Sequence, residues 1–171
     1  MIATFTRTQR AYIQDVSIAL HEAGHLSAAL SLGIPATATI EFDETSSGHT
    51  SYNRAGVSLQ SRLFVGFGAV AVTEKFQLHQ AGLLYDLADI ANLLSSFAVT
   101  EAETVKAKAR SDAAAFVEKH LGSIVRLALA LIEKRRLDED TAKKIFSGEI
   151  ITDTPDEFCT ALRLMPRVIW R

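Results

Sequence analysis

The sequence lacks most features of secreted, membrane-spanning and disulfide-stapled proteins. It contains one cysteine, Cys159, which excludes an internal disulfide and a thiolate-rich zinc site and makes a reducing cytoplasm the expected location. The longest apolar run, from Leu63 to Val72, is too short for a bilayer crossing, which needs about 20 residues. The first 15 residues lack the continuous apolar core of a secretory signal. We therefore expect neither a transmembrane segment nor export.

A strong charge of either sign is also missing, since 18 basic side chains stand against 20 acidic ones in 171 residues. A chain without a positive field does not gather phosphates, so we expect no nucleic-acid partner. Hydrophobic residues make up 48% of the chain, which is enough for a folded core and argues against disorder. We expect one domain over residues 1–147 and a C-terminal tail, 148–171, packed on it.

Apolar spacing predicts a mainly α (α+β) fold with a small β-hairpin after the first helix. Apolar residues recur at steps of three and four over 10–32, and Gly33-Ile34-Pro35 ends that helix. Residues 36–42 alternate as a strand does, and 49–52 can return as a second, antiparallel strand. Further helices are predicted over 57–77, 83–97, 101–120, 123–135, 138–146 and 156–164. Gly122 is predicted to cap the helix that ends at His120.

The first predicted helix contains His21-Glu22-Ala23-Gly24-His25, an HExxH pattern. Residues four apart on a helix share one face, so both imidazoles can bind one Zn²⁺ while Glu22 projects beside the metal-bound water. Zinc lowers the pKa of that water toward about 7, which lets a neighbouring carboxylate take a proton and pass it to a leaving amine. The pattern therefore predicts metal-assisted hydrolysis.

A simpler interpretation is an amphipathic helix whose histidines only form hydrogen bonds in the core. A random HExxH is expected about once in a hundred chains of this composition, so the surrounding sequence has to decide. Glu22 lies among the apolar residues Leu20, Ala23 and Leu26, and an unpaired buried carboxylate is destabilising. This placement favours a functional glutamate.

A catalytic zinc site normally takes three protein ligands, so a third must follow the two histidines. The metzincin extension is absent, because Ala28 and Ser31 occupy the positions of its glycine and histidine. The residues alone leave four candidates for the third ligand: Glu74, His79, Asp86 and Asp89.

The segment SIALHEAGHLSAALSLGIP resembles the zinc helix of the FtsH peptidases, the protease portion of membrane-bound AAA+ proteases. The similarity includes the HEAGH pentapeptide and the Leu-Gly-x-Pro that follows it. Ser47-Gly48-His49-Thr50 resembles the family's leucine-glycine-aromatic-threonine segment, which forms the edge beside bound substrate. The segment 68–74 is similar to its Gly-Arg-Ala-Ala-Glu helix. GLLYDL, residues 82–87, falls where the family has Gly-Ala-x-Asn-Asp-Leu, whose aspartate is the third zinc ligand.

This resemblance covers about 13–147 and implies a zinc metalloendopeptidase that cleaves flexible or unfolded polypeptides. It implies that Asp86 completes the zinc site with His21 and His25, and that Glu22 is the general base. Glu74 is a candidate to orient one of the histidines, and Asp89 is expected to be solvated or close behind the ligands. We expect His79 and His120 at the surface or at helix ends, and His49 on a strand that touches substrate.

The sequence departs from the family in having no GxxxxGK[ST] motif and no membrane helix, so we do not expect it to unfold proteins by itself. Either flexible peptides are its substrates or a separate AAA+ ATPase is its partner. Because the family forms a hexameric ring, a homo-oligomer is one expected state of this chain. Two other functions remain: a catalytically silent adaptor with a structural metal, and a hydrolase of another class, acting on a non-peptide amide or as a DNA-associated protease.

Overall fold

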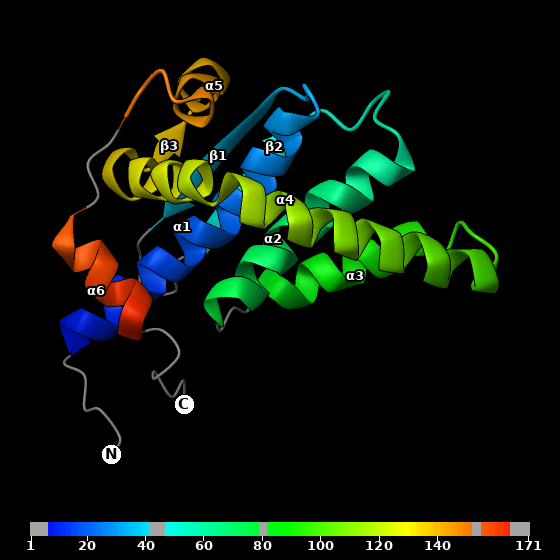
Figure 1. Ribbon diagram of the computed structural model, residues 1–171, viewed down its shortest axis with the longest axis horizontal. Helices are drawn as coiled ribbons and strands as arrows, with labels where there is room; N and C mark the ends of the chain where they lie inside the picture. The colour runs from blue at the N-terminus through cyan, green and yellow to red at the C-terminus, as the bar shows by residue number, and fades with distance from the viewer. Residues whose placement is uncertain (1–6, 42–46, 79–81, 152–154, 165–171) are drawn as a thin grey trace.

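The computed structural model describes residues 7–41, 47–78, 82–151 and 155–164. The fold is mainly helical with a small antiparallel sheet of three strands, which confirms the predicted fold class (Figure 1). None of the helices in these ranges is long and apolar enough to cross a membrane. In chain order the elements are α1 (Arg7–Ser31), β1 (Ala36–Glu41), β2 (Ser47–Tyr52), α2 (Leu59–Phe76), α3 (Gly82–Leu94), α4 (Val99–Lys134), β3 (Arg136–Leu137), α5 (Glu139–Ser147) and α6 (Asp156–Leu164).

Helix α1 is the central element of the fold. It contacts α2, α4, α5 and α6 as well as the strands β1 and β2. The apolar residues whose spacing predicts this helix are buried, as expected for a helix covered on several sides: Ile13, Val16, Leu20 and Ala23. Phe158 of α6 is buried as well, so this part of the C-terminal tail packs against α1.

Helices α1 and α2 touch through two glycines. A Cβ atom built on Gly24 would lie 2.8 Å from the Cα of Ala69, and one on Gly68 would lie 2.9 Å from the carbonyl oxygen of Gly24. Neither contact leaves room for a side chain, so the two backbones can approach this closely only with glycine at both positions. The glycine within HEAGH therefore has a packing role.

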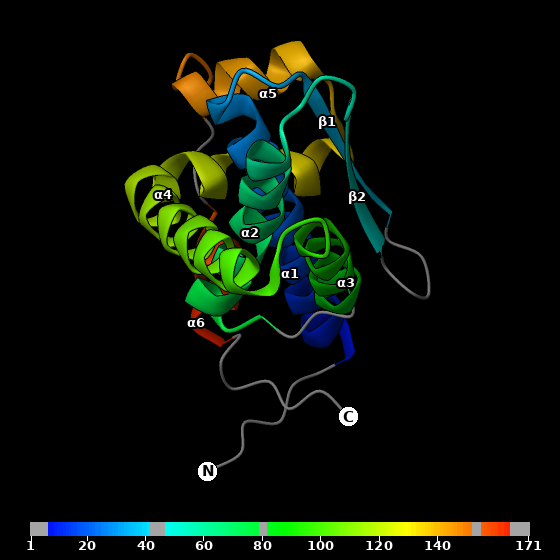
Figure 2. The same cartoon turned by 90° about the vertical axis from the view of Figure 1, so that its right-hand side faces the viewer.

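The sheet has the order β2-β1-β3, with both pairings antiparallel. Strand β2 pairs with β1 along its length, from Ala36 opposite Tyr52 to Glu41 opposite Ser47, and its other side is an outer edge (Figure 2). Strand β3 was not expected, because two residues are too few to produce a recognisable pattern. It joins the end of α4 to the middle of β1.

The predicted break at His120 is present as a kink, but Gly122 does not cap a helix end there, because its φ is not positive. Helix α4 continues from Val99 to Lys134 and only kinks at His120, whose φ of −110° and ψ of 17° are not helical. Apolar residues on both sides of the kink, including Val117 and Ile124, are buried, so packing keeps the two halves in one helix. The helix instead ends with Arg135 in the left-handed region at φ 67°.

Alanine substitutions of Gly68 and Gly122 should affect the free energy of unfolding differently. We expect Gly68→Ala to lower the free energy of unfolding by about 1–3 kcal/mol, because the new Cβ would lie 2.8 Å from the Cβ of Ala28. The control is the exposed Gly122, where the nearest atom to a new Cβ is 3.5 Å away and φ is not positive. Gly122→Ala should be neutral or stabilise by up to about 1 kcal/mol. Urea unfolding measures both, and equal effects would contradict the close helix contact.

Candidate metal centre

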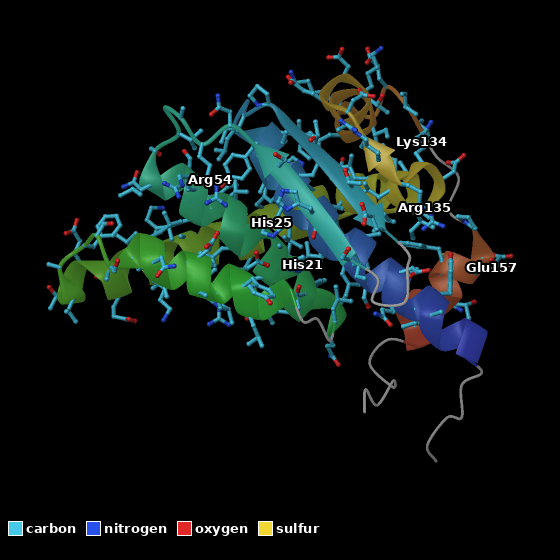
Figure 3. All side chains as sticks on the ribbon, turned by 180° about the vertical axis from the view of Figure 1, so that it is seen from behind. His21, His25, Arg54, Lys134, Arg135 and Glu157 are labelled. Atoms are coloured by element: carbon cyan, nitrogen blue, oxygen red, sulfur yellow. The ribbon has the colours of Figure 1, made fainter. Side chains whose placement is uncertain are left out.

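Two histidines of α1 and one aspartate of α3 converge on a common point. The Nε2 atom of His21 lies 2.7 Å from Oδ2 of Asp86, and Nε2 of His25 lies 3.2 Å from Oδ1 of the same carboxylate. One potential ligand atom from each residue lies within 4.8 Å of the others. Figure 3 shows both histidines beside the strand β2. The one-turn spacing within HExxH is what brings the two imidazoles to one face.

Helix α2 holds the other nitrogen of each imidazole ring. Nδ1 of His25 lies 3.1 Å from the carbonyl oxygen of Val65, and Nδ1 of His21 lies 3.0 Å from the hydroxyl of Thr73. A carbonyl can only accept, so Nδ1 of His25 carries a proton and, in the neutral ring, Nε2 keeps its lone pair. The Thr73 hydroxyl can accept from His21 in the same way. Such contacts orient histidines for metal binding.

Asp86 and the histidines perturb one another's protonation. Partial burial would raise the pKa of Asp86, but its contacts with His21 and His25 outweigh burial and hold that pKa well below its usual range. Burial has the opposite effect on His25 and lowers its pKa. The Asp86 carboxylate more than offsets this effect, so the pKa of His25 is raised overall. The negative carboxylate of Asp86 thus favours the protonated form of the His25 ring.

A buried carboxylate oxygen of Asp86 and the Nε2 atoms of His21 and His25 meet at a point where a metal ion could bind. Oδ2 of Asp86 is buried and has no hydrogen-bond partner among the described residues, even though Nε2 of His21 is only 2.7 Å away. The 3.2 Å distance between His25 and Asp86 is close to the spacing of about 3.3 Å between ligand atoms of tetrahedral zinc, whereas the 2.7 Å distance between His21 and Asp86 is that of a charged hydrogen bond. Two imidazole nitrogens and a carboxylate oxygen are also a donor set that zinc accepts. These residues could therefore hold a metal ion.

Glu22 is fixed beside the candidate ligands by strand β2. Its side chain is 6% exposed, and its Oε2 accepts a 2.6 Å hydrogen bond from the hydroxyl of Thr50. Gly48 makes this approach possible, because a Cβ there would lie 2.6 Å from Cγ of Glu22. The buried carboxylate thus has a partner through one oxygen. Its other oxygen, Oε1, accepts no such bond from Thr50.

One cavity of about 330 Å³ joins these groups. His21, Glu22, His25 and Asp86 all lie in its wall, so a ligand inside it can reach the candidate base and the candidate metal ligands together. Side chains from β2, the loop after it, α2 and α3 complete the wall, among them His49, Tyr52, Arg54, Arg62, Tyr85 and Asp89. The expected position of His49 on a strand is confirmed.

Two of the other candidates for the third ligand, Asp89 and Glu74, do not contact the histidines but pair with arginines. Asp89, one turn later on α3, is exposed and pairs with Arg54 at 3.3 Å, as expected for a solvated group. The prediction that Glu74 orients a histidine is wrong, because its carboxylate accepts a 2.6 Å hydrogen bond from Arg110 of α4. One step along α2 turns a side chain by about 100°, so Thr73 rather than Glu74 faces α1. His79 lies outside the described residues.

His120 is not simply a surface or helix-end residue. It lies at the kink of α4, half-buried, with its ring stacked 4.7 Å from Phe116 and 5.4 Å from Phe146 between centroids. Burial and the neighbouring Lys119 lower its pKa, which favours the neutral ring. It takes no part in the candidate metal centre.

Sequence reasoning missed the groups that hold the two imidazoles. Thr73 is a lone polar residue at the end of the apolar stretch 63–72, and a buried hydroxyl in such a stretch is a signal that a polar partner is near. The contact with the backbone carbonyl of Val65 cannot be recognised in the sequence, since every residue has a carbonyl. Thr50 belongs to the segment that resembles a substrate edge, but its bond to Glu22 could not be predicted because it depends on how β2 crosses α1.

The chain matches no protein-family model, and a search of curated proteins finds no match either. The similarity to FtsH peptidases consequently stands on the sequence motifs quoted above.

The two aspartates of α3 provide a matched test of the third ligand. We expect Asp86→Asn to weaken zinc binding by on the order of a hundredfold or more, because it removes a ligand charge from a site with two neutral imidazoles. Asp89→Asn should leave zinc affinity unchanged. Competition with a chromogenic chelator measures both affinities. Equal zinc binding by wild type and Asp86→Asn would contradict the assignment of this carboxylate.

Thr73 supplies a second test, directed at ring orientation. Thr73→Val keeps the shape of the side chain but removes the acceptor for Nδ1 of His21, and should weaken zinc binding about 10- to 100-fold. Thr73→Ser restores the hydroxyl and should bind zinc nearly as the wild type does. The same chelator competition applies. Equal zinc affinities for the valine and serine variants would show that this contact has no influence on the metal.

Proposed function

We propose that this chain is a zinc-dependent metalloendopeptidase that hydrolyses peptide bonds in flexible or unfolded polypeptides. One observation carries the proposal: the ligand atoms of His21, His25 and Asp86 converge in the wall of the same cavity that contains the carboxylate of Glu22. A structural metal site has no need of an additional carboxylate beside its ligands. A hydrolytic site does need one.

Each residue of the cluster has a role that its contacts support. His21, His25 and Asp86 would hold zinc, which when bound supplies a Lewis acid that polarises the scissile carbonyl and acidifies water. Glu22 takes a proton from the attacking water and later passes it to the leaving amine. Thr50 holds one oxygen of the Glu22 carboxylate, which leaves the other oxygen to receive the proton.

Strand β2 supports an extended polypeptide as the substrate. Its outer edge has unpaired backbone groups within the described sheet, and Thr50 of the same strand touches Glu22. An extended segment can pair with such an edge through backbone hydrogen bonds, which give affinity with little sequence preference. Because only a segment free of its own tertiary structure can extend in this way, we propose flexible or unfolded chains as substrates.

Folded proteins would have to be opened before they could reach the cavity. A separate AAA+ ATPase is the class of partner that we propose for this step, since such machines unfold and deliver polypeptides. The proposal for flexible substrates does not depend on this partner. We therefore test the peptidase reaction with a substrate that is already unfolded.

Replacing the base should separate catalysis from metal binding. We expect Glu22→Gln to retain zinc but to lose at least about a hundredfold in turnover of unfolded casein, because the amide cannot accept a proton. The matched control is Glu74→Gln. Glu74 pairs with Arg110 and has no part in the proposed reaction, so this variant should retain both zinc and activity. Zinc content and the release of acid-soluble peptides are measured on the same samples.

Two outcomes would contradict the proposed peptidase. Equal turnover by the wild type and Glu22→Gln would remove the glutamate from the reaction. Zinc binding without any cleavage, with flexible peptides and with ATPases added, would favour an adaptor that keeps a structural metal.

A further inference from the structure

Arg62 is a charged side chain of the cavity wall that has no side-chain partner among the described residues. It lies in the first turn of α2, half-buried, and lines the same cavity as the candidate metal ligands. Its Nε atom is buried, and across the described ranges neither a hydrogen bond nor an ion pair engages its guanidinium group. A guanidinium is charged at all physiological pH values, so this group cannot escape its position by losing a proton.

The other arginine of the cavity wall is satisfied. Arg54 pairs with Asp89 at 3.3 Å and stands 5.9 Å from the ring centre of Tyr52, with more than half of its side chain exposed. Arg126 also has a buried Nε without a partner, but its Nη2 donates a 2.9 Å hydrogen bond to Ser123. Arg62 therefore differs from both, because no acceptor in the described part of the chain contacts its guanidinium group.

The carboxylates of the cavity are already engaged elsewhere. Glu22 accepts from Thr50, Asp86 contacts the two histidines, and Asp89 pairs with Arg54. A divalent metal ion would turn the wall, which holds three carboxylates and two guanidinium groups, into a region of net positive charge. An anionic ligand is thus the partner that would satisfy Arg62, and a carboxylate matches the planar fork of its donors.

We propose that Arg62 binds a carboxylate of the substrate, so that the site prefers peptides with a carboxylate close to the scissile bond. The inference rests on the proposed function, because it places the scissile bond in this cavity. A volume of about 330 Å³ is at the small end of ligand pockets, which keeps the bound carboxylate near the reacting groups. The carboxylate can come from an acidic side chain or from the C-terminus of the peptide.

The test measures peptide binding to the zinc-loaded Glu22→Gln protein, in which cleavage is suppressed. Fluorescent peptides that differ only by glutamate or glutamine at one scanned position form the first arm. The same sequence with a free or an amidated C-terminus forms the second arm. We expect one acidic peptide to bind about 10- to 100-fold more tightly than its neutral counterpart, as charged hydrogen bonds do, and the arm in which it occurs identifies the source.

Substitutions then assign the preference to Arg62. Adding Arg62→Gln should bring the affinity ratio of acidic to neutral peptide close to one, whereas Arg62→Lys should retain part of it because charge remains. The matched control is Arg110→Gln, which removes an exposed guanidinium paired with Glu74 outside the cavity wall and should keep the ratio. Added salt should reduce the ratio in the parent protein.

Equal binding of acidic and neutral peptides in both arms would overturn the inference, as would an unchanged ratio in Arg62→Gln. The comparison of peptides in the parent protein does not depend on how well an Arg62 variant folds. Failure of the proposed function is a different result, since it would appear as turnover that does not depend on Glu22. The two ideas can therefore fail separately.

Discussion

The close contact between α1 and α2 determines the geometry of the whole candidate site. Gly24 lies between the two histidines of α1, and a Cβ there would be 2.8 Å from the Cα of Ala69 on α2. Because the helices touch at this point, the carbonyl of Val65 reaches one imidazole and the hydroxyl of Thr73 reaches the other. A larger separation would free both rings. Backbone packing thus sets the direction in which the lone pairs of the two Nε2 atoms point.

Two further elements complete the site by the same kind of close packing. Gly66 of α2 faces Ile90 of α3, whose Cγ1 would lie 3.1 Å from a Cβ on that glycine. Asp86 is one turn before Ile90 on the same helix face, so this contact carries its carboxylate toward the histidines. Gly48 in turn allows β2 to lie against Glu22. Small residues at each crossing let charged groups from three elements meet in one cavity.

The sequence predicts the local features of this site well and the long-range ones less completely. The apolar period predicts α1, and the four-residue step places both histidines on one face, because these depend on helix geometry alone. The choice of Asp86 came from similarity to FtsH peptidases, since periodicity could not separate it from Asp89. Thr73 was missed in favour of Glu74, because the facing side of α2 depends on its rotation against α1. The stop signal around Gly122 predicted a break at the right place, but packing on both sides of His120 keeps the two segments in one kinked helix.

Helix α3 buries little surface, so a metal ion bound at Asp86 would also help to hold this helix in place. Among the described side chains of this helix only Ile90 and Leu94 are fully buried, while Leu84 and Tyr85 are largely exposed. Asp86 is therefore one of few attachments between α3 and the rest of the fold. A bound ion would link α3 to α1 through its ligands. Removal of the ion would therefore let α3 detach before the remaining core unfolds. Binding of the metal would then order the part of the cavity wall that α3 contributes and complete the hydrolytic site in the same step.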